Sequence, residues 1–393
     1  MNKIKAIIAI IIALVLVRGG EVQAKTMDYS VNPILPENQV KKGVSYFDLL
    51  LEPDKQQTLE VELENLTEKK QTIKVLISSA VTNASGVVDY SPTNLPLDAS
   101  LKYNIKDYTQ APKVVNLAAH ERQVVKIKVK MPQTPFDGVI AGGITFQQEG
   151  QTEADNQAAA KGISVKNTYS YSIALLIRQN EKELPAQLKL HTIKAGQVNG
   201  RNVINVNLQN PEMAYLNTVN VEATVRGLTH KEVAYTYSNP MLQMAPNTNF
   251  NLPIPTSNQN AATRVSEPLQ AGKYELEMVV SARTDPKGAY EAARNGKKEN
   301  YRYQWTFKKT FTIAQGESDK LNKSDPTIKT THKSWMWQGI LLGLIFLMAA
   351  VLLLLIKKRR QTKAQEIENQ KLREKLAKQA QTIEELNAQK KEK

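Results

Sequence analysis

An unbroken apolar run over residues 340–356, near the C-terminus, restricts the fold of this chain more than any other feature. With Trp335 and Trp337 at its N-terminal edge, the segment reaches the roughly 20 residues that a helix needs to cross a bilayer. Tryptophan suits the lipid headgroup layer, because it is apolar and carries one N–H donor. The alternative is a core helix of a soluble domain, but core helices rarely lack polar residues over so many turns. The sequence therefore predicts a transmembrane helix over residues 335–356.

Four consecutive cations, Lys357, Lys358, Arg359 and Arg360, follow this segment directly. Positive residues beside a span stay on the cytoplasmic side, so we expect the N-terminus outside the cell and the basic tail, 357–393, in the cytoplasm. The tail is rich in helix formers and in opposite charges at helical spacing, which predicts a helix. Its apolar residues keep heptad spacing for only about two heptads, which leaves both a solvated or membrane-skimming helix and weak self-association open.

A shorter apolar run, residues 6–17, follows a basic start at the N-terminus. Small residues up to Ala24 match the pattern that a signal peptidase reads, so we expect cleavage between Ala24 and Lys25. The alternative is an uncleaved anchor, but about a dozen apolar residues fall short of the roughly 20 that a spanning helix needs. Residues 1–24 are therefore predicted to be a signal peptide.

The chain contains no cysteine, so an exported domain must be held by ordinary hydrophobic cores rather than by disulfides or zinc–thiolate sites. Its formal charge is +14, but residues 25–334 carry 37 basic against 31 acidic residues, which is a mild excess. A surface of this kind tolerates anionic wall polymers, yet it lacks the Lys/Arg cluster that a phosphate track needs. We expect no nucleic-acid partner.

Period-two alternation dominates from residue 25 to about residue 313 and predicts strands with one buried face. Residues 59–63 and 73–77 alternate on either side of a polar turn, so we expect them to form a hairpin. A second hairpin is expected between the glycine-rich segment 138–146 and the segment 169–177, joined by an exposed loop over 147–161. The glycines of 138–146 indicate close backbone packing, with a binding role as the alternative.

Further strands are expected after Pro185, in short segments with turn signals between them and no helical period. They are residues 188–193, 202–208, 219–225, 274–280 and 301–307, the last running into Ile313. This spacing favours an all-β fold of two tandem immunoglobulin-like antiparallel β-sandwich domains, over 25–180 and 181–314. The polar segment 315–334 is expected to be a flexible stalk.

No catalytic or metal-ligating pattern is present in the sequence. The four histidines, His120, His191, His230 and His332, stand singly, and no nucleophile elbow, phosphate loop or calcium loop appears. We therefore expect no enzyme activity, no cofactor and no catalytic or metal site, while the partner-binding residues stay open. Two alternatives remain. One is a wall-processing enzyme with convergent carboxylates in a cleft, and the other is a ligand sensor that signals through the helical tail.

Several short runs recur in a fixed order and together carry a family resemblance. They are 29–33, 45–49, 57–65 and 136–144 in the first domain, and 198–202, 207–211, 244–250 and 269–274 in the second. With the C-terminal anchor, they resemble the WxL-interacting proteins of Gram-positive bacteria over residues 27–313. That resemblance implies a peptidoglycan-binding domain, then a host-binding domain, in a non-enzymatic adhesion protein of the cell wall. Its implied partners are WxL-domain surface proteins, peptidoglycan and host extracellular-matrix proteins. The boundary between 150 and 185 stays open, because the family's division can assign the strand 169–177 to the second domain.

Overall fold

The chain separates into two units in the computed structural model, which describes residues 28–149, 170–259, 265–328 and 335–391. One unit ends at Lys329 and the other begins at Thr330, and each is described by itself. The expected cleavage site between Ala24 and Lys25 and most of the expected loop 147–161 lie outside the described residues.

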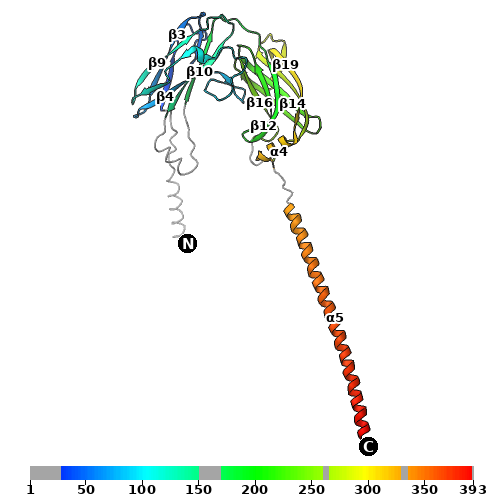
Figure 1. Ribbon diagram of the computed structural model, residues 1–393. Helices are drawn as coiled ribbons and strands as arrows, with labels where there is room; N and C mark the ends of the chain where they lie inside the picture. The colour runs from blue at the N-terminus through cyan, green and yellow to red at the C-terminus, as the bar shows by residue number, and fades with distance from the viewer. Residues whose placement is uncertain (1–27, 150–169, 260–264, 329–334, 392–393) are drawn as a thin grey trace, which may run out of the picture. The chain divides into compact units, whose positions relative to one another are not determined.

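The alternating residues of the first segment build a β-sandwich with one four-stranded and one five-stranded sheet (Figure 1). Its strands are β1 (Tyr29–Ile34), β2 (Phe47–Leu50), β3 (Gln56–Asn65), β4 (Gln71–Ser79), β7 (Thr109–Gln110), β8 (Val114–Leu117), β9 (Arg122–Lys130), β10 (Ile140–Glu149) and β11 (Ser170–Arg178). The sheet orders are β1-β3-β9-β7 and β2-β11-β10-β4-β8, with β2 parallel to β11. Between the sheets, the buried Tyr29 hydroxyl donates to the Phe146 carbonyl at 2.7 Å. Burial raises the pKa of Tyr29 to about 12, so the hydroxyl keeps its proton and the bond.

The hairpin predicted for β3 and β4 is wrong, although both strands are present. They lie in opposite sheets, because the polar turn between them crosses the sandwich instead of reversing within one sheet. Asn65 holds this crossing: its side-chain amide donates to the carbonyls of Lys69 and Ala118 at 2.8 and 2.7 Å. Period-two alternation shows which face of a strand is buried but leaves its neighbour undetermined.

The second predicted hairpin is confirmed, since β10 and β11 pair antiparallel with Ile140 opposite Ile177. This pairing places β11 in a sheet of the first sandwich. The glycines of β10 serve close packing: a Cβ at position 143 would lie 2.1 Å from the carbonyl oxygen of Tyr90. Short strands β5 (Val81–Thr82) and β6 (Val88–Asp89) and a helical turn, α2 (Ile105–Tyr108), complete the connections of this sandwich.

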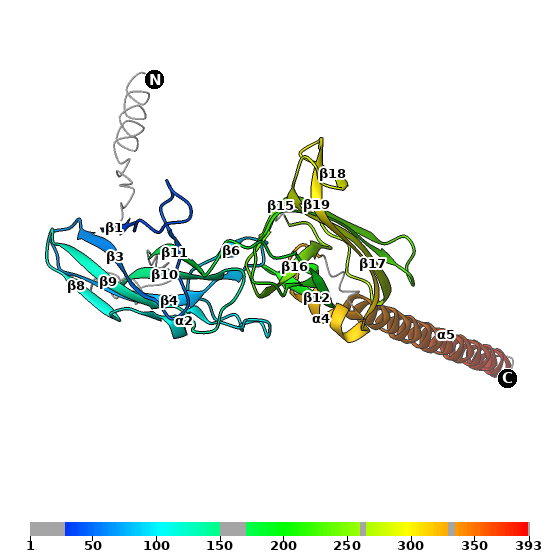
Figure 2. The same cartoon turned by 90° about the horizontal axis from the view of Figure 1, so that it is seen from above.

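The second sandwich pairs a three-stranded sheet, β12-β13-β16, with a five-stranded sheet, β15-β14-β17-β19-β18 (Figure 2). Its strands are β12 (Lys189–Val198), β13 (Arg201–Asn210), β14 (Leu216–Gly227), β15 (Ala234–Met244), β16 (Thr248–Pro255), β17 (Gly272–Thr284), β18 (Tyr290–Arg294) and β19 (Lys297–Ile313). The five strand segments expected from the sequence fall within β12, β13, β14, β17 and β19. The predicted class, two tandem immunoglobulin-like sandwiches, is therefore the fold of the molecule.

A third, smaller apolar cluster joins the two sandwiches. It contains Val139 and Leu176 from the first and Ala245 from the second, with Tyr90 and Tyr215 packed against it. Backbone hydrogen bonds cross the same joint, from Val139 to Met213 at 2.7 Å and from Gln243 to Gly86 at 2.8 Å. Apolar side chains from both sandwiches pack together at the joint, and backbone hydrogen bonds link them there. The joint therefore holds the two sandwiches together as one body.

The flexible stalk expected over 315–334 is wrong for residues 315–328. Helix α4 (Gln315–Ser324) packs Leu321 against the second core, and its carbonyl accepts a bond of 2.9 Å from Gln197. Beyond the helix, Asp325, Thr327 and Ile328 are buried. The segment is poor in apolar residues, but its polar groups are bonded to the sandwich, and composition alone does not reveal such bonds. The rest of the expected stalk lies outside the described residues.

The second unit is the long helix α5 (Trp335–Lys391), which is continuous through the apolar segment and the basic tail. By length and composition, its apolar part is a candidate membrane span, and none of that part is buried. An exposed apolar helix does not fit the alternative of a soluble core helix, whose apolar side chains would be covered.

Candidate functional site

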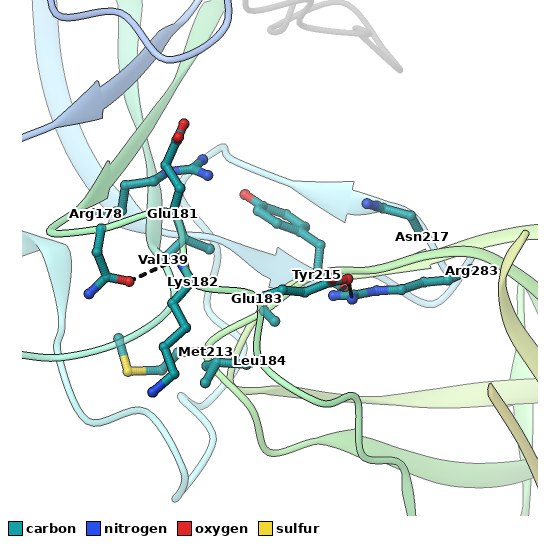
Figure 3. A pocket seen from close by; sticks show the side chains of 13 residues that line it. Val139, Arg178, Glu181, Lys182, Glu183, Leu184, Met213, Tyr215, Asn217 and Arg283 are labelled. Carbon is teal, nitrogen blue, oxygen red and sulfur yellow. Dashed lines mark hydrogen bonds and ion pairs between the residues drawn. The ribbon is translucent and has the colours of Figure 1, made fainter. Parts of the chain in front are cut away.

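A hollow of about 380 Å³ lies at the joint between the two sandwiches (Figure 3). The end of β11 and the segment after it form one wall, and β14 with the turn before it forms another. The lining residues are Gly138, Val139, Arg178, Asn180, Glu181, Lys182, Glu183, Leu184, Met213, Ala214, Tyr215, Asn217 and Arg283. Figure 3 shows Arg178 on one side, Arg283 on the other and Tyr215 between them. The hollow is therefore polar and shared by both sandwiches.

Arg178 forms the most buried ion pair of this hollow. Its Nη2 atom donates to Oδ1 of Asp48 at 2.5 Å, and the side chains of Arg178 and Asp48 are 22% and 7% exposed. Asp48 is held in turn by Gln39, whose side-chain oxygen accepts from the Asp48 backbone N–H at 3.2 Å. Separating the two side chains would leave each charge poorly hydrated and without a partner, which is costly. The pair therefore holds the end of β11 against β2.

Two tyrosines extend this polar cluster across the joint. The hydroxyls of Tyr90 in the first sandwich and Tyr215 in the second lie 3.1 Å apart. Burial raises the pKa of both phenols, that of Tyr215 well above its ordinary value of 10.0. Both therefore stay neutral at physiological pH, and their contact is a hydrogen bond between the sandwiches rather than an acid–base pair.

Glu183 ties the segment after β11 to the second sandwich. It pairs with Arg283 and with Arg302, whose Nη1 lies 2.8 Å from Oε1, while Arg283 also donates to the carbonyl of Tyr215 at 3.2 Å. Lys182 pairs with Asp137 at 2.5 Å. Each cation of the hollow thus has a carboxylate partner within the protein. The charges mainly hold the joint, and what remains for a ligand is a polar, partly open surface.

A second set of hydrogen bonds crosses the joint away from the hollow. Asp98, in the long loop before α2, accepts from Gln209 at 2.8 Å and from Asn249 at 2.5 Å, both in the second sandwich. Burial acts to raise the pKa of Asp98, but bonds from Ser100, Asn249 and Gln209 outweigh it and hold the pKa below its usual value. The carboxylate is thus a hydrogen-bonding hub between the sandwiches.

The outer face of the five-stranded sheet in the second sandwich carries two adjoining hollows of about 500 and 290 Å³. Glu222 and Val279 line both of them. Glu277 lies in the larger one, where hydrogen bonds and charge from Lys308 hold its pKa below the usual value. The lining of these hollows mixes hydroxyls and charges with apolar atoms, which suits contact with a partner surface of mixed polarity.

The outer face of β9 in the first sandwich carries a row of three exposed lysines, Lys126, Lys128 and Lys130. Lys126 lies 3.8 Å from Glu60, and Lys130 lies 3.4 Å from Asp54. Lys128, exposed between them, has no carboxylate partner among the described residues. The row therefore combines two lysines that are paired with carboxylates and one that is not.

The residues singled out from the sequence lie apart from these surfaces. Trp335 and Trp337 are in the first turn of α5, and Lys357, Lys358, Arg359 and Arg360 follow its apolar part, exposed. No group of three or more histidine, aspartate or glutamate side chains is placed to hold a metal in the part of the chain that the structure describes. Sequence reasoning missed the joint residues Asp48, Asp98 and Arg178, because polar residues in loops and at strand ends give no periodic signal. Of the run 136–144, Gly138 and Val139 lie in the wall of the hollow.

Two family models match the chain in tandem. Residues 29–148 match the "WxL Interacting Protein, peptidoglycan binding domain", and residues 160–323 match the "WxL Interacting Protein, host binding domain". The chain belongs to the WxL-interacting protein family. In this member, the second matched region includes β11, which pairs within the first sandwich, and α4, which packs on the second. The WxL-interacting protein is a cell-surface binding protein whose two matched domains are both binding domains.

Solved structures with similar folds are distant in sequence. The class 5 fimbriae chaperone CfaA is 10% identical, with 71% of this chain and 98% of that chain covered and a TM-score of 0.26. The CupB2 chaperone of Pseudomonas aeruginosa is 12% identical, with coverages of 66% and 95% and a TM-score of 0.24. A PapD-like domain of human CEP192 is 15% identical, with coverages of 42% and 97% and a TM-score of 0.25. No curated protein matches the chain.

Proposed function

We propose that this WxL-interacting protein is a non-enzymatic, membrane-anchored adhesion component. In this proposal it holds WxL-domain proteins at the cell wall, contacts peptidoglycan through its first sandwich and engages host matrix proteins through its second. The observation that carries the proposal is the tandem match of two binding domains, followed by an exposed apolar helix with four cations at its end. We propose a boundary between residues 180 and 181, a second domain that extends through α4 to Ile328, and a signal peptide cleaved between Ala24 and Lys25.

The joint between the sandwiches supports a scaffolding role. Apolar packing around Val139 and Leu176, the Tyr90–Tyr215 bond and the Asp98 bonds all cross it. A fixed joint keeps a wall-binding surface and a partner-binding surface at a constant spacing, so that both can be occupied at once without an ordering cost in the linker.

The first prediction concerns orientation. Protease added to intact, wall-stripped cells is expected to remove the β-sandwiches and leave a C-terminal epitope tag intact, because the cations that follow the apolar helix stay in the cytoplasm. The measurement is immunoblotting of the tag and of an epitope placed after Lys25, with permeabilised cells as the control. A tag that is digested in intact cells would reverse the proposed topology.

The second prediction concerns partners. Purified protein spanning residues 25–328 is expected to capture a WxL-domain protein from the same cell surface and to sediment with purified peptidoglycan. Partner capture should survive moderate salt, since protein interfaces take most of their energy from apolar and aromatic anchors. Peptidoglycan binding should weaken, because charge is screened over about 10 Å at 0.1 M salt.

A variant of the exposed lysine row separates wall binding from partner capture. Replacing Lys126, Lys128 and Lys130 by glutamine is expected to weaken sedimentation with peptidoglycan while leaving WxL capture unchanged. Release of wall glycan fragments by the purified protein, with no WxL protein captured, would replace the adhesion proposal with the wall-processing alternative.

A further inference from the structure

Helix α5 continues from its apolar part into the basic tail as one helix (Figure 1). Residues 344–391 contain neither proline nor glycine, the residues at which many sharp helix kinks occur. A helix of this kind leaves the membrane as a rod instead of turning to lie in the headgroup layer. The continuity therefore argues against a membrane-skimming tail, one of the arrangements that the sequence leaves open.

One side of the tail helix carries an apolar seam with heptad spacing. With Asn369 at position a, Leu372 falls at d and Leu376 at the next a, and the two leucines are 58% and 57% exposed. Positions a and d of a heptad lie along one side of a helix, where a partner helix can cover them. The seam positions in the sequence are Asn369, Leu372, Leu376, Gln379, Ile383 and Leu386.

The seam begins beyond the membrane. At 1.5 Å per residue, Asn369 lies about 18 Å along the helix from Lys357, the first cation after the apolar part. The headgroup layer on each side of a bilayer is only about 5–8 Å thick. The seam therefore lies in water, where covering its leucines is favourable.

Membrane anchoring determines how two copies of this helix meet. Both copies cross the bilayer in the same direction and at the same depth, because the cations of 357–360 hold the same position in each. Their tails are therefore parallel and in register before they touch. About two heptads are too few for a stable coiled coil in solution, but confinement to one membrane raises the effective concentration of one tail beside another.

The residues at and beside the seam are complementary to themselves in this alignment. Asn369 faces its own copy, and a single asparagine at position a specifies register and oligomer state. Glu368, at g, comes beside Arg373, at e, of the second copy, and symmetry forms this pair twice. Within the described residues, neither Glu368 nor Arg373 has an ion-pair partner in its own chain. The next g and e positions are Lys375 and Ala380, so no like charges meet there.

We propose that the cytoplasmic part of α5 pairs with a second copy of this chain as a short parallel coiled coil along the seam. Gln379, at a d position, keeps this pairing weak and reversible. A paired anchor presents two copies of each binding domain, which strengthens attachment to a wall that offers many sites. The inference rests on the membrane anchoring in the proposed function and goes beyond it.

The test uses cysteine crosslinking of the full-length chain in isolated membranes treated with a mild oxidant. The protein has no cysteine of its own, so each variant carries a single thiol. In a parallel pair, Cα atoms at a and d are about 5–6 Å apart, within disulfide range, whereas those at f are about 13–15 Å apart. Leu372→Cys and Leu376→Cys are expected to form a dimer. Ile367→Cys, at an apolar f position that is 55% exposed, is the matched control and should form none.

A charge swap checks the register. In the Leu372→Cys background, Arg373→Glu is expected to reduce the crosslinked dimer, because like charges then meet between g and e. Adding Glu368→Arg should restore the dimer. The purified chain in liposomes should give the same pattern as the isolated membranes.

Four results would overturn the proposal. They are equal crosslinking at Leu372→Cys and Ile367→Cys, no dimer at either seam position, a charge swap that fails to restore the dimer, and crosslinking only to a different protein. The last would assign the seam to a cytoplasmic partner. A C-terminal tag digested in intact cells would remove the anchoring on which both proposals rest. A protected tag without seam-specific crosslinking would leave the proposed function standing and remove the pairing.

Discussion

Replacing Asp48 by alanine is expected to lower the free energy of unfolding of the first sandwich by about 3 kcal/mol. The substitution leaves Arg178 without its carboxylate in a site where its side chain is only 22% exposed. The Nε atom of Arg178 is already buried without a hydrogen-bond partner in the structure, so the guanidinium has no second acceptor to turn to. Guanidinium chloride denaturation of residues 25–328, followed by circular dichroism, measures the loss.

A matched control is Glu291→Ala, which removes the carboxylate of an exposed pair with Lys298. Both side chains of that pair are mostly hydrated, so the midpoint of denaturation should barely move. The double variant Asp48→Ala, Arg178→Met should recover part of the stability lost in Asp48→Ala, since an apolar side chain leaves no uncompensated charge. Equal losses in Asp48→Ala and Glu291→Ala would show that the Arg178 pair is hydrated in solution and does not stabilise the joint.

Many of the longer strands could be predicted from the sequence, because a sheet with one buried face imposes period two on its side chains. Tyr274, Leu276 and Met278 of β17 are buried as that pattern requires. Strands β15 and β16 were missed because their prolines weaken a strand prediction, although Phe250, Leu252 and Ile254 do alternate in β16. Proline is tolerated in these strands because both lie at sheet edges.

Strand neighbours and the joint could not be predicted in the same way. The hairpin expected for β3 and β4 failed because alternation is equally satisfied when two strands face each other across a core. Asp98 bonds to Gln209 and Asn249, which lie 111 and 151 positions after it in the chain. Contacts at such separations depend on the completed fold, and single polar residues leave no local pattern that would announce them.

The C-terminal end of the second sandwich also could not be predicted from local sequence patterns, and it connects the sandwich to the proposed membrane anchor. Residues 315–334 look like a stalk by composition, yet the sandwich continues to Ile328 through hydrogen bonds together with the packing of Leu321 and the burial of Ile328. If α5 spans the membrane as proposed, pulling forces on the bound wall or host partners pass from the sandwich to the membrane through this short segment. Its attachment then determines how the adhesion protein resists detachment.

Asp325 is the residue on which that attachment depends most. Asp325 is only 2% exposed. Its carboxylate accepts hydrogen bonds from the Ser257 hydroxyl at 2.7 Å and from the Asn202 backbone N–H at 2.8 Å. It also accepts from the Thr327 backbone at 2.9 Å and the Thr327 hydroxyl at 2.6 Å. Asp325→Ala leaves the two Thr327 donors and the Ser257 hydroxyl buried without this acceptor, while the Asn202 N–H keeps its bond to the Ser257 oxygen at 3.1 Å. The substitution is expected to cost about 3 kcal/mol of unfolding free energy. Limited proteolysis should then cut early in the segment that follows α4, around residues 325–328. This gives a local measurement in addition to denaturation.

The same residue gives stability a defined dependence on pH. Burial acts to raise the pKa of Asp325, but hydrogen bonds from Thr327, Ser257 and Asn202 outweigh it, so the pKa in the folded protein lies below the ordinary 3.8. Because the folded pKa is the lower one, the stabilisation is fully present above about pH 5 and is lost as pH falls through the folded pKa. Denaturation of the native protein and of Asp325→Asn between pH 7 and pH 2 should therefore give curves that converge at low pH. A constant gap between the native and Asp325→Asn curves would show that the carboxylate charge plays no part.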